Sequence, residues 1–164
     1  MPTYNFLAHG RDKTGNRGLS PQALQQTGPL IPVTLNVQPV LEEELRRTGK
    51  TAPATQQGMG LIDTGATRTA VDEKVLQTLG IKPISRIYVG TAAGKNEHGI
   101  FPIQLVFQSP PASVVVQCVG VDLAGQKMVA EEGQMDIIAL IGRDILSRTI
   151  FVYNGTLGII SLSL

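Results

Sequence analysis

The feature that most constrains this chain is an acidic residue that directly follows an apolar pair. Leu61 and Ile62 predict the end of a β-strand, and Gly65 predicts a sharp turn immediately after it. Asp63 would then stand at the rim of a sheet, where the backbone holds its carboxylate in place. An Asx-turn at a strand end is the structural interpretation of Asp-Thr-Gly, and a chemically active carboxylate is the functional one.

The composition favours one β-rich domain. The chain has 164 residues, of which 42% are hydrophobic, and this is enough for a core. Its 18 glycines and 10 prolines indicate many turns, which are typical of an all-β or β-rich fold. Charged residues make up only 16% and aromatic residues 4%, with a net charge of +1. A nucleic acid is therefore not an expected partner, because the chain lacks basic runs and base-stacking rings.

Cysteine and histidine usage indicates that no cofactor or metal is needed. A single cysteine, Cys118, excludes an internal disulfide framework and a cysteine-based zinc site, and its apolar strand predicts a buried structural thiol. His9 and His98 lack the set of acidic or thiol ligands that a metal site needs and are predicted to be surface residues. No apolar run approaches the ~18 residues of a membrane span, and no signal-peptide pattern is visible. A cytoplasmic protein with no membrane partner is the expectation.

The chain before Asp63 is predicted to hold an arm, a strand and an inserted connection. Residues 1–28 form the arm, with a short helix that Ser20 caps and Gly28 ends. Residues 30–38 alternate apolar and polar and predict a half-buried strand. The inserted connection spans 39–58: residues 41–49 predict a helix, and 50–58 a polar loop. In that helix the expected charge pairs are four residues apart, namely Glu42 with Arg46 and Glu43 with Arg47.

The chain after Asp63 is predicted to be mostly strands. Asp72 is expected to cap a short helix that Gly80 ends. A long β-hairpin is predicted over 84–107, with strands at 84–89 and 99–107 around a turn at 91–96. The remaining expectations are a strand at 113–121, a loop at 122–136, a buried strand at 137–142, helical turns at 143–148, and a hairpin of 150–153 and 157–162 around Asn154-Gly155.

Two segments, in this order, resemble the retropepsin-like aspartic proteases, which comprise the retroviral proteases and their cellular and bacterial relatives. They are Leu61-Ile62-Asp63-Thr64-Gly65-Ala66 and Ala139-Leu140-Ile141-Gly142-Arg143-Asp144-Ile145-Leu146. The resemblance covers about residues 30–164 and implies an all-β fold, a closed β-barrel of the acid protease type with one or two short helices. It implies a protease domain over 29–164, an aspartic endopeptidase activity with Asp63 as the catalytic residue, and a flap formed by the 84–107 hairpin.

The chemistry of this family needs two carboxylates that share one proton. The ionised carboxylate takes a proton from water while the protonated one polarises the peptide carbonyl. Only one Asp-Thr-Gly is present in this chain, so the second carboxylate has to come from another copy. The expected assembly is a twofold homodimer, and the expected substrate is an extended peptide or protein bound as an added strand.

The resemblance also implies roles for the neighbours of Asp63. Thr64 would form a hydrogen bond across the twofold axis, Gly65 would let the backbone approach the substrate, and Ala66 would support the site. Gly142 would leave room for the Asp63 loop to cross beneath it. Candidate flap residues that would contact substrate are Tyr88, Thr91, Ala92, Ala93 and Gly94.

The sequence departs from the retroviral pattern beside the active site. Thr67 and Arg68 stand where many retroviral enzymes carry acids, and this puts the internal salt bridge of Arg143 in question. Arg68 and Asp144 are the candidate pair that would replace it.

Two alternatives to a peptidase that acts on other proteins stay open from the sequence. The chain can be a non-catalytic dimer of the same fold that is used for peptide binding or scaffolding, since fold and function separate easily. It can also be self-processing, with the arm 1–28 cut or held in the cleft. The resemblance allows the arm to pack on a partner subunit, and a loosely ordered extension is equally compatible with its composition.

Overall fold

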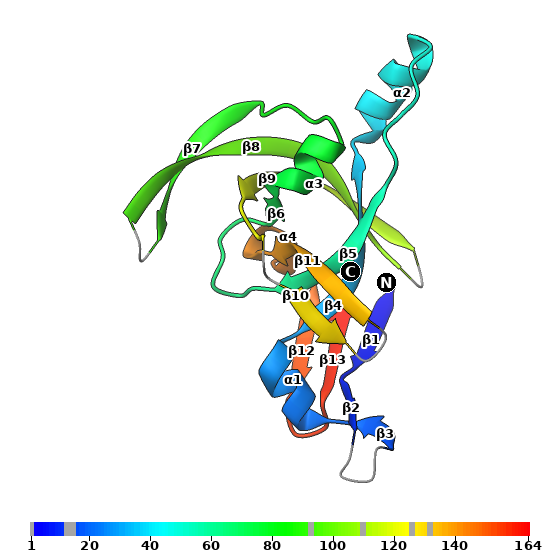
Figure 1. The fold of residues 1–164 in the computed structure, drawn as a ribbon, viewed down its shortest axis with the longest axis vertical. Coiled ribbons are helices and arrows are strands. Elements are labelled where there is room, and N and C mark those ends of the chain that lie inside the picture. The colour runs from blue at the N-terminus through cyan, green and yellow to red at the C-terminus, as the bar shows by residue number, and fades with distance from the viewer. Residues whose placement is uncertain (1, 12–15, 92–93, 109–110, 125–126, 131–132) are drawn as a thin grey trace.

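The computed structural model describes residues 2–11, 16–91, 94–108, 111–124, 127–130 and 133–164 (Figure 1). Most of the described chain is β-strand, with a few short helices, as the composition predicts. The strands are β1 (Thr3–Leu7), β2 (His9–Arg11), β3 (Arg17–Leu19), β4 (Leu30–Val37), β5 (Gln56–Ile62), β6 (Ala70–Asp72), β7 (Ser85–Thr91), β8 (Gly94–Phe107), β9 (Ala112–Val121), β10 (Lys127–Ala130), β11 (Gly133–Ile141), β12 (Ile150–Asn154) and β13 (Ile159–Ser163). The helices are α1 (Pro21–Thr27), α2 (Pro39–Arg47), α3 (Glu73–Thr78) and α4 (Arg143–Leu146).

Six strands close into a barrel. Their order is β11-β5-β4-β8-β9-β6, and β6 returns to pair with β11. Apolar side chains at every second position of a strand fill the interior of the barrel. They include Ile31, Val33 and Leu35 of β4 and Ile103 and Leu105 of β8, all of which are buried. The predicted all-β closed barrel is therefore confirmed.

The strand order brings a loop under the end of β11. β11 lies between β5, to which it is parallel, and β6, to which it is antiparallel. Since β5 and β6 are consecutive in the chain, the residues 63–69 that join them have to cross the end of β11. This crossing places Asp63 beside the β11–α4 junction.

Residues of the predicted arm belong to a second sheet at the opposite end of the molecule from the β7–β8 hairpin (Figure 1). β1 pairs with β13, and β13 pairs with β12. Within the same segment α1 has the predicted ends: the Ser20 side chain accepts a hydrogen bond from the Ala23 N–H, and Gly28 has a φ of 75°.

The predicted hairpin around Asn154-Gly155 is confirmed, with a longer loop. Its last strand pair is Asn154 with Ile159, so residues 155–158 form the connection. The Asn154 side-chain oxygen accepts a hydrogen bond from the Leu157 N–H, which closes this loop.

The inserted connection 39–58 differs from its prediction at both ends. α2 begins at Pro39, and its ion pairs are three residues apart, Glu43 with Arg46 and Glu44 with Arg47, so the predicted pairs four apart are wrong. The loop prediction is wrong for 56–58, because β5 pairs there with β4 despite two glutamines and a glycine. None of the α2 residues is buried, and the helix stands away from the barrel (Figure 1).

The loop prediction for 122–136 is wrong for 127–130 and 133–136. β10 and β11 pair antiparallel there, from Lys127 with Asp136 to Ala130 with Gly133. The segment mixes charged residues with Met128, Val129 and Ala130, and its strand state comes from the pairing of β10 with the first residues of β11.

The long hairpin is confirmed, and its strands run further than predicted. β7 and β8 pair from Ser85 with Ile100 to Thr91 with Gly94, so the predicted turn at 91–96 is shorter. α3 also has its predicted ends, since the Asp72 carboxylate accepts a hydrogen bond from the Lys74 N–H and Gly80 has a φ of 64°. No helix in the described part of the chain is long and apolar enough to cross a membrane.

Candidate active site

Asp63 follows the last residue of β5 and is held by the backbone. Its N–H donates to the Ile141 carbonyl at 3.0 Å, which continues the pairing with β11 by one residue. Its Oδ1 accepts hydrogen bonds from the N–H of Gly65 at 2.9 Å and of Ala66 at 3.1 Å. The Asx-turn is thus present, and the carboxylate is partly buried. Within the described residues Oδ2 has no hydrogen-bond partner, so one carboxylate oxygen is positioned and the other is free to act.

Gly142 is crossed closely by the loop that carries Asp63. A Cβ at this position would lie 2.4 Å from the carbonyl carbon of Arg68 and 2.7 Å from the N of Thr69. Such distances leave no room for any side chain, because the neighbouring atoms are backbone. The close passage that the resemblance implied for Gly142 is therefore a feature of this fold.

A buried polar network joins the two chain segments at this crossing. Thr69 is completely buried, and its hydroxyl accepts a hydrogen bond from the Gly142 N–H at 3.1 Å and donates to Asp144 Oδ1 at 2.8 Å. Asp144 Oδ1 also accepts hydrogen bonds from the backbone N–H groups of Thr69 and Ile145. We did not predict this network from the sequence, and its only local signal is a threonine at the start of a buried strand.

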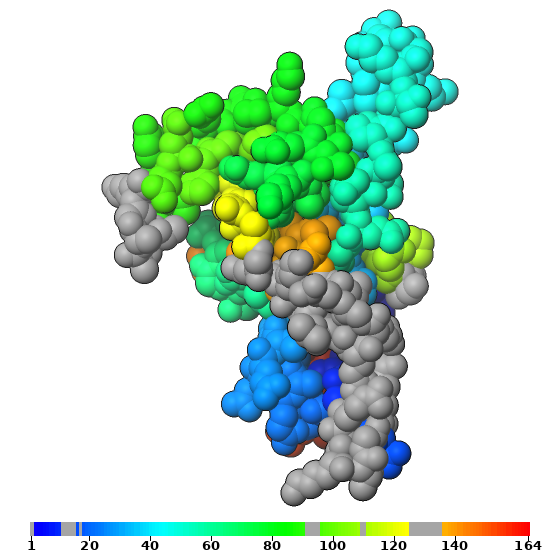
Figure 2. Space-filling view, in the orientation of Figure 1, coloured from blue at the N-terminus to red at the C-terminus, as the bar shows by residue number. Residues whose placement is uncertain are grey.

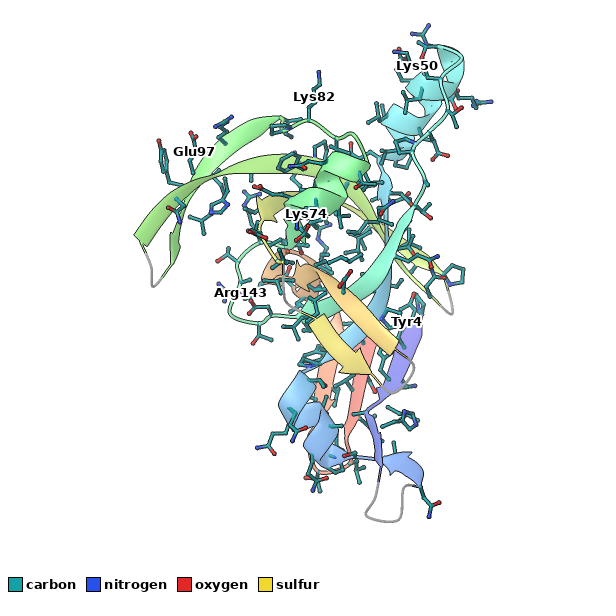
Figure 3. All side chains as sticks on the ribbon, viewed as in Figure 1. Tyr4, Lys50, Lys74, Lys82, Glu97 and Arg143 are labelled. Carbon is teal, nitrogen blue, oxygen red and sulfur yellow. The ribbon has the colours of Figure 1, made fainter. Side chains whose placement is uncertain are left out.

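Arg143 supports the Asp63 loop through neutral groups. Its guanidinium donates to the carbonyls of Thr64 at 2.9 Å and Gly65 at 3.2 Å, and to the Thr67 hydroxyl at 3.0 Å. Figure 3 shows Arg143 beside this loop. The prediction that Arg68 and Asp144 form an ion pair is wrong, because the described residues include no ion pair between them and Thr69 binds the carboxylate instead.

The β7–β8 hairpin arches over the side of the barrel where residues 63–69 lie (Figures 1 and 2). Its inner face contributes Ile87 and Val89 to a small apolar cluster. Buried at its centre are Ala70, Ile100 and Val119, with Val121 and Leu140 packed around them. This cluster is separate from the main core and borders the strand that follows the Asp63 loop.

Three of the predicted flap residues, Tyr88, Thr91 and Gly94, lie within the described part of the chain. Tyr88 lies between Ile87 and Val89 and is 74% exposed, on the opposite face of β7 from the apolar cluster. Thr91 and Gly94 are the last strand pair of the hairpin. Ala92 and Ala93 lie outside the described residues. Thr64 and Gly65 are exposed and Ala66 is half-buried, so the Asp63 loop presents its tip at the surface.

The single cysteine and the two histidines are the other side chains with reactive groups that the sequence singled out. Cys118 is completely buried, and burial raises the pKa of its thiol to about 12, so it is not a thiolate nucleophile near neutral pH. His9 is exposed as predicted, whereas His98 is half-buried with its Nδ1 2.8 Å from the Gly120 carbonyl. The described ranges contain no group of three or more His, Cys, Asp or Glu side chains that could hold a metal ion.

The comparison with known proteins gives structural likenesses only. No protein-family model and no characterised protein matches the sequence. The structure is similar to the solution structure of the simian foamy virus (mac) protease, with 14% identity and a TM-score of 0.41 over 71% of this chain and 91% of that one. It is also similar to a retropepsin-like aspartic protease from Rickettsia conorii, with 17% identity and a TM-score of 0.47 over 98% and 91% of the two chains. At these values the likeness carries no argument about activity, which has to rest on the residues themselves.

Proposed function

We propose that this chain is a retropepsin-like aspartic endopeptidase that works as a homodimer. The observation that carries the proposal is the state of Asp63: one carboxylate oxygen is fixed by two backbone N–H groups, and the other has no hydrogen bond among the described residues. The loop around it is locked by Gly142 and Arg143. A rigidly held, partly buried carboxylate at a strand end is suited to general acid–base work.

One carboxylate is not sufficient for this reaction, because the acid and the base have to act at the same time. A second copy would bring its own Asp63 across a twofold axis, and the two carboxylates would share one proton. The exposed Thr64 and Gly65 offer the surface on which two such loops can meet, with Thr64 bonding across the axis.

The ionised carboxylate takes a proton from a water molecule while the water oxygen attacks the peptide carbonyl carbon, and the protonated carboxylate gives its proton to the carbonyl oxygen. The carboxylic acid formed in this step then gives its proton to the amine nitrogen as the C–N bond of the tetrahedral intermediate breaks. The other carboxylate takes a proton from one hydroxyl of the intermediate as the carbonyl re-forms, so that the pair again shares one proton. No cofactor takes part. The β7–β8 hairpin would act as the flap, closing over an extended peptide and excluding water.

A mixing experiment tests both the activity and its shared site. Purified wild-type protein is incubated with a library of blocked peptides, and products are identified by mass spectrometry. An equimolar addition of Asp63→Asn protein should then lower the cleavage rate to about half once subunits exchange, since mixed dimers hold only one active carboxylate. Addition of Asp136→Asn protein, altered at an exposed carboxylate on β11, should not lower it.

Three results would contradict the proposal. Peptide cleavage that persists in purified Asp63→Asn protein would exclude Asp63 as the catalytic group. A strictly monomeric mass in solution, together with an undiminished rate on mixing, would exclude the shared site. If wild-type protein binds peptides and cleaves none, including its own residues 1–28, the non-catalytic alternative holds.

A further inference from the structure

Two arginines flank the candidate active site without an acidic partner. Arg68 is exposed, and within the described residues its side chain has neither an ion pair nor a hydrogen bond. Arg143 is exposed too, and its three hydrogen bonds all go to uncharged oxygens. The described ion pairs lie elsewhere, on α2 and between Arg86 and Glu97 of the hairpin.

The nearby carboxylates bind neutral groups and form no described ion pair with either arginine. Asp144 is half-buried and uses one oxygen for three hydrogen bonds to Thr69 and Ile145. Asp72 is buried and binds the N–H groups of Lys74 and Leu123. Asp63 Oδ1 is bound by its own turn, and its Oδ2 has no hydrogen bond among the described residues. The Arg68 guanidinium therefore lies exposed next to the catalytic candidate, with no ion pair among the described residues.

The attachment of Arg68 is rigid although its side chain is exposed. Its carbonyl carbon is pressed against Gly142, and the next residue, Thr69, is completely buried. A fixed backbone gives the guanidinium a defined reach from the loop, which lowers the entropy lost when it binds a ligand. The guanidinium is planar and presents paired N–H donors that match the two oxygens of a carboxylate.

We propose that Arg68 is a specificity residue that binds an acidic side chain of the peptide substrate, with Arg143 adding to the positive field. The inference rests on the proposed function and names its substrate class: extended peptides with Asp or Glu a few residues from the bond that is cut. A peptide strand lying along the 63–69 loop presents alternate side chains to it, so one such position would reach Arg68.

The test compares matched peptides that differ by a Glu-to-Gln change at one position. A blocked peptide library first identifies the position at which acids are enriched, and kcat/KM is then measured for the Glu and Gln peptides. Wild-type protein should prefer the Glu peptide roughly three- to tenfold, as expected for a partly exposed ion pair. Arg68→Gln should bring this ratio to about one, and Arg68→Glu should invert it. Arg47→Gln, altered at an exposed arginine on α2, is the matched control and should keep the wild-type ratio.

Binding to Asp63→Asn protein separates this inference from the proposed function. That variant keeps both arginines, so the Glu peptide should bind it more tightly than the Gln peptide by a similar ratio even where nothing is cleaved. Cleavage without any acidic preference, or a preference that Arg68→Gln retains, would overturn the inference and leave the peptidase intact. A weaker dimer in Arg68→Gln with an unchanged Glu-to-Gln ratio would also overturn it, since Arg68 would then pair with a carboxylate of the second copy.

Discussion

The loop that carries Asp63 and the hairpin that arches over it are held in opposite ways. The loop is held by hydrogen bonds along its length, from the Asp63 N–H to the Ile141 carbonyl, from the Arg143 guanidinium to the Thr64 carbonyl, and from the Gly142 N–H to the buried Thr69 hydroxyl. The hairpin is held on one face, where Ile87 and Val89 join a small apolar cluster, while Tyr88 on its other face is 74% exposed.

In the proposed function, this difference separates the chemistry at Asp63 from the access of the substrate. Carboxylates that share a proton need positions fixed to a fraction of an ångström, and a densely bonded crossing supplies this. A covering element has to open for the substrate, and few buried contacts keep the free energy of opening low. Substitutions in the loop are thus expected to have large effects, and substitutions on the hairpin small ones.

The largest effect is expected at Asp63 itself. Asp63→Asn keeps an acceptor oxygen for the Gly65 and Ala66 N–H groups, so the turn should survive while the charge is lost. Peptide cleavage should fall on the order of 10³-fold or more, with an unchanged thermal unfolding midpoint. Asp136→Asn is the control for the loss of one exposed carboxylate, and near-normal activity in Asp63→Asn would contradict the assignment.

A substitution at Gly142 should cause the next largest loss. Gly142→Ala places a Cβ against the backbone of Arg68 and Thr69, which has to shift. The free energy of unfolding should fall by about 3 kcal/mol, the upper part of the usual range for overpacking. Urea unfolding measures this, with Gly18→Ala as the control because no atom lies within 4 Å of a Cβ there. Equal stability of the two variants would show that the backbone of Arg68 and Thr69 lies further from Gly142 than these distances indicate.

Removal of the Thr69 hydroxyl tests the buried network. Thr69→Val keeps the shape and leaves the Gly142 N–H without its acceptor and Asp144 without one donor. We expect a loss of about 2 kcal/mol in the free energy of unfolding. Thr69→Ser retains the hydroxyl and should lose less, so a larger loss in the serine variant would argue that methyl packing, and not the hydrogen bonds, stabilises the site.

The smallest effect is expected on the hairpin. Arg86 and Glu97 form an ion pair at 2.8 Å with side chains that are 67% and 41% exposed. A double-mutant cycle with Arg86→Gln and Glu97→Gln should give a coupling free energy below about 1 kcal/mol. A coupling of about 2 kcal/mol or more would mean that the hairpin is held as firmly as the loop, and the contrast between the two regions would fail.

Local signals predicted much of the site and its frame. The Asx-turn at Asp63, the caps of α1 and α3 at Ser20 and Asp72, and the long hairpin follow from neighbouring residues alone. These features were predictable because a turn, a cap or a two-residue alternation is decided within a few positions of the chain.

What the sequence could not predict depends on distant partners. The strand state of 56–58 comes from pairing with β4, and the Asp144 carboxylate faces Thr69, 75 positions away. For the same reason Arg143 binds the carbonyls of Thr64 and Gly65, and the expected pair of Arg68 with Asp144 does not form.

The sequence by itself determined that Asp63 stands at a strand end and that Gly142 follows a second apolar strand 79 positions later. Only the tertiary structure decided how the two meet. Because β11 inserts between two strands that are consecutive in the chain, the Asp63 loop has to pass against Gly142. This close contact fixes the position of the Asp63 carboxylate and leaves the Arg68 side chain exposed beside it.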